Sequence, residues 1–350
     1  MTERVLSTRE LNRALLARQL LLERSSLPLP RALEAVGGLQ TQYAPSGYVG
    51  LWSRLRNFRR ASLTEALMKR QAIQGTLMRS TIHTVSAADY WFFQAGTKGT
   101  LREWWLRIVR HQAADLHMEL AAKILRERLE RGPARDRDLR AALRERGLPD
   151  IAWSGVRLWL DMVRIPPSGT WERKRADLYA LADGWVPARA TTEADGIVLL
   201  VRRYLGGFGP GAVVDIASWA GLPPAKVAPV VERLRLKRYR DEAGRVLFDL
   251  PNATLPDAGS RAPVRFLLTF EALTMIHARR AQVMPEQYRP IIFSTKTPHS
   301  MPVFLIDGAV AGTWRYEDGR VRLDPFEPVA RTMRRELDEE ASELAAFHGE

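Results

Sequence analysis

The sequence contains no cysteine, and this absence excludes disulfide bonds, thiolate metal sites and a cysteine nucleophile together. No apolar run approaches the roughly 20 residues that a membrane-spanning helix requires, so we expect no membrane partner. The first twenty residues lack the basic start, apolar middle and small-residue cleavage site of a secretory signal. We therefore expect a protein of the cytoplasm.

Several catalytic and cofactor motifs are also missing. The six histidines show no HExxH spacing, and the chain has neither a GxSxG elbow nor a Walker loop. The glycines of residues 207–212 match the spacing of the dinucleotide fingerprint, but the structural context does not fit. The fingerprint requires a strand before the glycines, whereas the preceding IVLLVRRYL is typical of a helix. We expect no metal and no cofactor.

The charge balance is strongly basic. There are 53 Lys and Arg residues against 40 Asp and Glu, which gives a net charge of +13. Such a balance favours a polyanionic partner, since each neutralised phosphate releases condensed counterions. Nucleic acid is the leading expectation, although basic enzymes of small molecules exist and an arginine-rich composition can reflect a GC-rich genome.

The order of elements in the first part of the chain is typical of a winged helix. Ser7 and Glu10 fit a capping box that opens a helix, and Gly37–Gly38 end a second, short helix. LQTQYAP follows as a turn, then a helix from about residue 46 to 55, and GTLMRSTIHTVS is expected to form a strand pair.

A similar plan recurs twice. DRDLRAALRERGLP leads through an apolar segment to a hairpin at PPSGTWERKRADLYALAD, and GPGAVVDIASWAGLPPAKVAPVVERLR is a clear helix–turn–helix that Gly221 divides. Beyond the linker NATLPDAGSRAP the pattern predicts strands, with turns at Asp307–Gly308 and Asp318–Gly319. A charged helix from about Pro328 to Phe347, in which both charge signs are interspersed, is expected to be a solvated packing helix.

Two basic stretches are candidates for contact with a polyanion. Arg79, Ser80, Thr81 and His83 lie on an expected wing strand, where they form either a phosphate clamp or ordinary polar groups of a half-buried strand. The run 173–175 beside Trp171 could enter a groove, and the alternative is a solvated basic turn. Trp314 and Arg315 are expected at a structural strand corner.

Together these stretches resemble a known family. The segments that carry the resemblance, in the same order along nearly the whole chain, are LQTQYAPSGYVGLWSRL, LMRSTIHTVSAADYW, VRIPPSGTWERKRADLYALAD, RYLGGFGPGAVVDIASWAG and IDGAVAGTWR. They are similar to the AlkZ- and YcaQ-like winged-helix DNA glycosylases. The combination of LQTQYAPS with PPSGTW in one chain is specific, whereas either alone is weak.

The resemblance implies an α+β fold of three tandem winged helices in a C-shape with a small C-terminal β-barrel. The implied units are residues 1–95, with the catalytic motif, 96–188, with a DNA-inserting hairpin, 189–255, and 256–350, with the barrel and final helix. The implied residues of the hairpin that contact DNA are Arg164, Ser168, Thr170, Trp171, Arg173, Lys174 and Arg175.

The family signature, glutamine followed two positions later by glutamine or aspartate, falls here on Gln40 and Gln42. This is the form of the AlkZ-like branch. Alkylation at purine N7 or N3 already makes the base a good leaving group, so the site needs a positioned water more than a strong base. An amide oxygen can accept from that water, and an extended LQTQ would direct both amides to one side. The alternative is that a glutamine in a helix–turn–helix turn caps a helix or reads adenine edges.

The resemblance therefore implies a monofunctional glycosylase that releases alkylated purines, including bulky natural-product adducts or interstrand crosslinks, in base excision repair or antibiotic self-resistance. Its partner would be double-stranded DNA bearing alkyl lesions, bound by a monomer at the bacterial nucleoid. Two alternatives share the winged-helix features: a noncatalytic DNA-binding regulator, and a protein that sequesters lesions without cleaving them.

Overall fold

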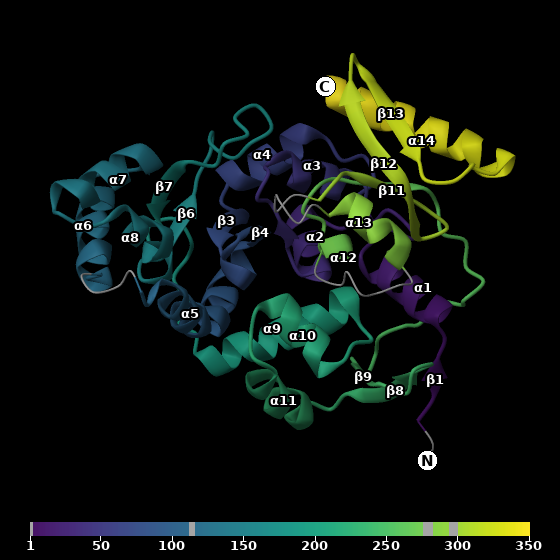
Figure 1. The fold of residues 1–350 in the computed structure, drawn as a ribbon, viewed down its shortest axis with the longest axis horizontal. Coiled ribbons are helices and arrows are strands. Elements are labelled where there is room, and N and C mark those ends of the chain that lie inside the picture. The colour runs from purple at the N-terminus through teal and green to yellow at the C-terminus, as the bar shows by residue number, and fades with distance from the viewer. Residues whose placement is uncertain (1–2, 112–115, 276–282, 294–299) are drawn as a thin grey trace.

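The structure is a computed structural model, and it describes residues 3–111, 116–275, 283–293 and 300–350. It is a mixed α+β fold, in which the described strands form sheets of three, four and six strands (Figure 1). In the part of the chain that is described, no helix is both long and apolar enough to cross a membrane.

The N-terminal segment follows the local signals of the sequence. The capping box is present: Ser7 Oγ accepts from the main-chain N–H of Glu10, and Glu10 Oε2 accepts from that of Ser7. The second helix ends at Gly37 in the left-handed region, at φ 78°. The elements are β1 (Val5–Leu6), α1 (Thr8–Arg18), α2 (Leu29–Val36), β2 (Leu39–Gln40), α3 (Pro45–Trp52), α4 (Arg60–Met68), β3 (Ala72–Thr76), the 3₁₀ turn η1 (Met78–Ser80) and β4 (Ile82–Ser86).

The long helix α5 (Ala87–Val109) leads into a second unit with the same order, namely helix, short strand, two helices and a hairpin. Its elements are α6 (Met118–Glu130), β5 (Ala134–Arg135), α7 (Asp136–Glu145), α8 (Asp150–Gly155), the 3₁₀ turn η2 (Val156–Leu158), β6 (Met162–Arg164) and β7 (Leu178–Leu181). The hairpins of the two units share one six-stranded sheet, ordered β2-β4-β3-β6-β7-β5. The antiparallel pairing of β3 with β6, which joins them, was not predicted from the sequence.

The third unit repeats the order once more. Its elements are α9 (Glu193–Phe208), α10 (Val213–Ala220), α11 (Pro224–Arg233), β8 (Lys237–Asp241) and β9 (Val246–Asp249). A bridge between Gly211 and Phe248 takes the place of the short strand, and β1 adds to β8 in parallel. Gly221 ends α10 at φ 73°, as predicted. The glycines of residues 207–211 begin within the last turn of α9, so a helix stands where a dinucleotide fingerprint requires a strand.

The C-terminal unit differs from the expected barrel. In the described ranges its strands form an open antiparallel sheet, ordered β10-β11-β12-β13, and its first and last strands do not pair. Its elements are β10 (Arg265–Leu267), α12 (Ala272–Met275), η3 (Glu286–Tyr288), α13 (Arg289–Ile292), β11 (Val303–Ile306), β12 (Ala309–Glu317), β13 (Arg320–Pro325) and α14 (Arg331–Gly349). The turns at Asp307–Gly308 and Asp318–Gly319 link the strands as predicted, with positive φ at all four residues.

The hydrophobic core joins the two ends of the chain. One cluster of buried side chains combines residues between 32 and 72 with residues between 264 and 347, so α2, α3 and α4 pack against the C-terminal sheet and α14. A separate cluster lies within residues 101–179. Figure 1 shows α14 and the β12–β13 hairpin beside α3, while α6, α7 and α8 lie at the far side. The C-terminal sheet therefore stands next to the segment that carries the two glutamines.

Candidate active site

The glutamine segment forms an edge of the six-stranded sheet. Gln40 pairs with His83 of β4, and the main-chain N–H of Thr41 donates to the carbonyl oxygen of Ile82 at 2.8 Å. A side chain at Gly38, which has φ 79°, would place its Cβ 2.8 Å from a methyl of Val85. Glycine at this position therefore lets the chain leave α2 and approach β4 closely.

Thr41, between the two glutamines, is anchored in the interior. It is 1% exposed, and its Oγ1 lies 2.9 Å from Thr84 Oγ1. Its methyl group contacts α3, where a Cβ on Gly47 would come within 2.8 Å of it. The backbone that carries both glutamines is therefore fixed by a β-branched side chain with no room to shift.

The two amides have different surroundings. Gln40 is only 8% exposed, whereas Gln42 is exposed. Gln42 Oε1 accepts a hydrogen bond of 3.1 Å from the main-chain N–H of Ile82. An amide oxygen has two acceptor positions, so the side-chain carbonyl of Gln42 retains one for another donor.

Arg79 holds the other amide. It lies at the tip of the β3–β4 hairpin, at φ 54°, and its guanidinium donates to Gln40 Oε1 at 3.1 Å and to the main-chain oxygen of Trp219. The ion pairs found among the described residues do not include Arg79. Burial lowers the pKa of Arg79 to about 10, so it remains a cation at pH 7. Arg79 is half-buried, and its guanidinium is engaged by Gln40 and by the main-chain oxygen of Trp219 instead of standing free as a phosphate clamp would.

His83 is a neutral partner of Arg79. It is 2% exposed, and burial, followed by the charge of Arg79, lowers the pKa of His83 to about 3. Its Nδ1 lies 3.1 Å from the carbonyl oxygen of Thr81, and its Nε2 lies 3.2 Å from the Arg79 guanidinium. These partners assign the proton to Nδ1 and leave Nε2 as an acceptor. Ser80 and Thr81 are half-buried beside it.

Three of the residues expected to contact DNA from the second hairpin are buried instead. Ser168 Oγ accepts from the main-chain N–H of Asp177 at 2.7 Å, and Thr170 Oγ1 donates to the carbonyl oxygen of Pro167 at 2.9 Å. The Arg164 guanidinium donates to Thr76 Oγ1 and lies over the ring of Tyr179. Because these side chains hold residues 165–177 in shape, their role here is structural.

The exposed part of this loop is its basic run. Arg173, Lys174 and Arg175 are all exposed, but the guanidinium of Arg175 lies 3.0 Å from Asp136 and 3.5 Å from Asp177. Arg173 and Lys174 have no ion-pair partner among the described residues. These two side chains are therefore the cations of the loop that are available for contact with a polyanion.

Trp171 is not an exposed wedge. Its ring packs edge-on against Tyr48, Phe347 and His348, with centroids 5.0–5.7 Å apart, and the guanidinium of Arg60 covers it. The loop therefore docks on α3 and on the C-terminal end of α14. Trp314 is likewise structural, as expected, since its Nε1 donates to the carbonyl oxygens of Leu267 and Val303.

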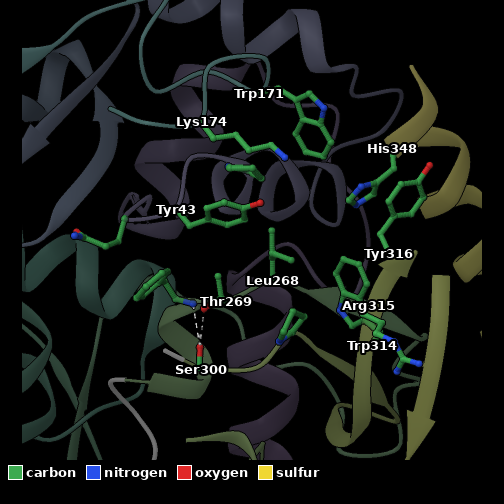
Figure 2. A pocket seen from close by; sticks show the side chains of 14 residues that line it. Tyr43, Trp171, Lys174, Leu268, Thr269, Ser300, Trp314, Arg315, Tyr316 and His348 are labelled. Atoms are coloured by element: carbon green, nitrogen blue, oxygen red, sulfur yellow. Dashed lines mark hydrogen bonds between the residues drawn. The ribbon is translucent and has the colours of Figure 1, made fainter. Parts of the chain in front are cut away.

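A pocket of about 690 Å³ opens where these elements meet. Gln42 lines it, and Figure 2 shows side chains from the loop, the C-terminal sheet and α14 facing the same space. Its lining residues include Gln42, Tyr43, Trp171, Lys174, Tyr316 and His348. Sequence reasoning missed Tyr43, Tyr316 and His348, because nothing local links a loop after β2, a strand and the end of the last helix.

The lining of the pocket contains no carboxylate among the described residues. A general base of the usual kind is therefore missing beside Gln42, and the amides can only orient a water or a sugar oxygen through hydrogen bonds. Arg79 and Lys174 make the surroundings positive. This arrangement can position a nucleophile and bind phosphate, but it does not by itself offer a side chain that takes a proton near pH 7.

Comparisons with known proteins show the family of the chain. Residues 33–347 match the family of AlkZ-like DNA glycosylases. Among solved structures, the DNA glycosylase AlkZ of Streptomyces sahachiroi is similar, with a TM-score of 0.83 and 17% identity over 99% of this chain and 97% of that one. No curated protein sequence matches significantly.

Proposed function

Because the chain belongs to the AlkZ-like DNA glycosylase family, a group of DNA repair enzymes, we propose that it hydrolyses the N-glycosidic bond of purines alkylated at N7 or N3 in duplex DNA. The proposal covers bulky adducts and interstrand crosslinks as well as methyl lesions. The observation that carries it is the pair Gln40 and Gln42 at a fixed sheet edge, with one amide buried against a cation and the other on the wall of a pocket.

The chemistry suits a site without a carboxylate. Alkylation places positive charge on the base, so the base leaves readily and the sugar passes through an oxocarbenium-like state. Water attacks the anomeric carbon, and the bond between that carbon and the purine nitrogen breaks with its electron pair going to the base. The proton of the water passes to solvent once the new bond has formed.

We assign the two glutamines different roles. Gln42 is exposed and keeps a free acceptor position on Oε1, so it orients the attacking water. Gln40 cannot move as freely, since Arg79 holds its oxygen, and its NH₂ group is the part left to hold the water or an oxygen of the DNA backbone. Arg79 acts through Gln40 and is a positioning residue.

The rest of the chain would hold the duplex. We propose that the three repeated units act as winged helices, with the limits 1–95, 96–188 and 189–255, and that one protein molecule binds one lesion-bearing duplex. Arg173 and Lys174 are the contacts with DNA that the exposed loop offers best.

The test is release of free base. The protein is incubated with duplex DNA that carries 7-methylguanine, and free base and alkali-labile abasic sites are measured. We expect release above the spontaneous rate, and a loss of about 100-fold or more in Gln40→Ala/Gln42→Ala. Gln71→Ala, at an exposed glutamine outside the pocket lining, is the control and should retain full activity.

Binding without release would support the sequestering protein instead. Full activity of the double variant would show that the two amides are not the catalytic groups.

A further inference from the structure

The pocket beside Gln42 has walls made largely of aromatic rings. His348 lies at their centre: its ring stacks on that of Tyr316, with centroids 4.3 Å apart, and meets Trp171 edge-on at 5.0 Å. Tyr43 and Tyr316 are each 38% exposed, so both present ring surface to the space between them. Figure 2 shows these rings around the opening. Flat aromatic ligands stack on walls of this kind.

One wall carries signs of a built site. Phe270 lines the pocket at φ 64°, a backbone conformation that a bulky residue rarely adopts, and Ser300 Oγ, 3.0 Å from its main-chain N–H, helps to hold it. Backbone strain of this kind concentrates at functional sites. In addition, His348 Nε2 is buried without a hydrogen-bond partner among the described residues. An orphaned ring nitrogen in a pocket wall is a group that a polar ligand edge can satisfy.

The pocket has a neutral interior and a positive charge at its rim. Burial, followed by the nearby cations Arg60 and Lys174, lowers the pKa of His348 to about 4, so its ring is neutral at pH 7. Arg315 is neutralised by Asp324 at 2.6 Å and Glu317 at 3.3 Å. Lys174 alone reaches over the opening without an acidic partner among the described residues. Figure 2 shows its ammonium between Tyr43 and Trp171.

We propose that this pocket receives the alkylated purine together with its substituent, after the damaged nucleotide has left the base stack. The inference rests on the proposed function and adds to it where the base goes. A purine ring stacks on aromatic side chains, and a cationic purine gains further from their electron-rich faces. Lys174 at the rim then meets the phosphate of the extruded nucleotide, and Gln42 in the wall meets the sugar.

The size of the pocket points to bulky substituents. At about 690 Å³ it lies within the range of roughly 300–1,000 Å³ that holds drug-sized ligands. A methylated purine fills only part of such a space, whereas a purine with an aromatic substituent offers a second planar group to the same rings. We therefore expect bulky aromatic adducts to bind more tightly than methylated bases.

Binding of free bases tests the proposal without DNA and without turnover. The full chain is titrated with 7-benzylguanine and with 7-methylguanine, and affinity is measured by calorimetry and by quenching of tryptophan fluorescence. We expect 7-benzylguanine to bind more tightly, and Tyr316→Ala to weaken its binding about tenfold. Tyr43→Ala removes a ring from a different element and should act in the same direction.

Tyr239→Ala is the matched control, because Tyr239 is a half-buried tyrosine of β8 that does not line the pocket. No binding of either base, or equal binding by wild type, Tyr316→Ala and Tyr43→Ala, would overturn the proposal. The two hypotheses fail separately. A protein that binds free bases through these rings but releases none from DNA would support the base-binding pocket and contradict the glycosylase activity. Release of base from DNA without binding of free base would support the activity and contradict the pocket.

Discussion

Arg79 donates a hydrogen bond of 3.1 Å to the side-chain oxygen of Gln40, although 39 positions separate the two residues in the sequence. The contact depends on the hairpin tip, where Arg79 and Ser80 both adopt the left-handed conformation. It also depends on the third unit, since the same guanidinium donates to the main-chain oxygen of Trp219 at the end of α10. One half-buried cation therefore connects the glutamine edge to an element more than a hundred residues away.

Replacing Arg79 should lower catalysis more than DNA binding. In Arg79→Met the Gln40 amide loses a charged partner worth about 1.5–3 kcal/mol, so we expect release of 7-methylguanine to fall about 10- to 100-fold. Single-turnover release measures the rate, and titration with duplex measures affinity. Arg335→Met removes an exposed arginine of α14 and should change neither. An equal loss of affinity and rate in Arg79→Met would instead indicate a direct phosphate contact.

The pH profile of base release should be flat from about pH 5 to pH 9. The amides do not titrate, the pKa of buried His83 is lowered to about 3, and burial lowers the pKa of Arg79 only to about 10. His83 therefore stays neutral and Arg79 charged across this window. Gln42→Glu adds a group that becomes a base when it loses its proton, so its rate should rise with pH and then level off. A wild-type rate that changes tenfold between pH 6 and pH 7 would require a catalytic group outside this site.

Salt dependence should separate the basic residues of the loop. Removing one phosphate contact lowers the slope of log affinity against log salt by about 0.9. We expect this change for Lys174→Ala, and a smaller one for Arg175→Ala, because Asp136 and Asp177 already neutralise Arg175. Lys69→Ala, at a lysine paired with Glu65, serves as the control. Equal slopes in the Lys174 and Arg175 variants would mean that DNA breaks the ion pairs of Arg175.

Gly47 should be critical for activity because of its neighbour Thr41. A Cβ at Gly47 would lie 2.8 Å from the Thr41 methyl, and Thr41 is held by Thr84. Gly47→Ala should therefore displace both glutamines and slow base release about tenfold or more, as misplaced catalytic groups do. Gly99→Ala, in α5 with open space around the new methyl, is the matched helix control and should retain full activity. Unchanged release by Gly47→Ala would show that the glutamine segment tolerates displacement.

The ion pair between Arg54 and Glu271 should matter for stability. The side chain of Arg54 is fully buried, that of Glu271 is 6% exposed, and their charged atoms lie 2.9 Å apart. Arg54→Met leaves the carboxylate buried and unpaired, so we expect a loss of about 3–5 kcal/mol in the free energy of unfolding. Urea unfolding measures this loss. Adding Glu271→Gln should restore part of it, and a double variant no more stable than the single one would exclude the pair as the cause.

Features that depend on neighbouring residues were predictable from the sequence. The capping box at Ser7, the helix ends at Gly37 and Gly221, and the turn at Asp318–Gly319 each follow from residues within one turn of the chain. Their physical causes are local hydrogen bonds and the left-handed conformation.

Features that depend on long-range pairing were not predictable. Nothing in LQTQ says that Gln40 will face His83 or lie over Arg79, and nothing in the final helix says that His348 will reach a pocket near Gln42. The interspersed charges of this helix predict a solvated packing helix, but they do not say which elements it packs against. Its buried Leu337, Leu344 and Phe347 face the C-terminal sheet and the tryptophan of the loop.

The pairing of β3 with β6 has a mechanical consequence. Both hairpins belong to one continuous sheet, so the glutamine edge and the basic loop cannot separate without breaking the backbone pairing that aligns Gln74 with Arg164 and Gly75 with Val163. The enzyme cannot adjust the spacing between them by a hinge at that point. The distance between the glutamine edge and the basic loop is therefore fixed, and a duplex that contacts both must bend to match it. Sequences or lesions that make DNA easier to bend will match it at lower energetic cost.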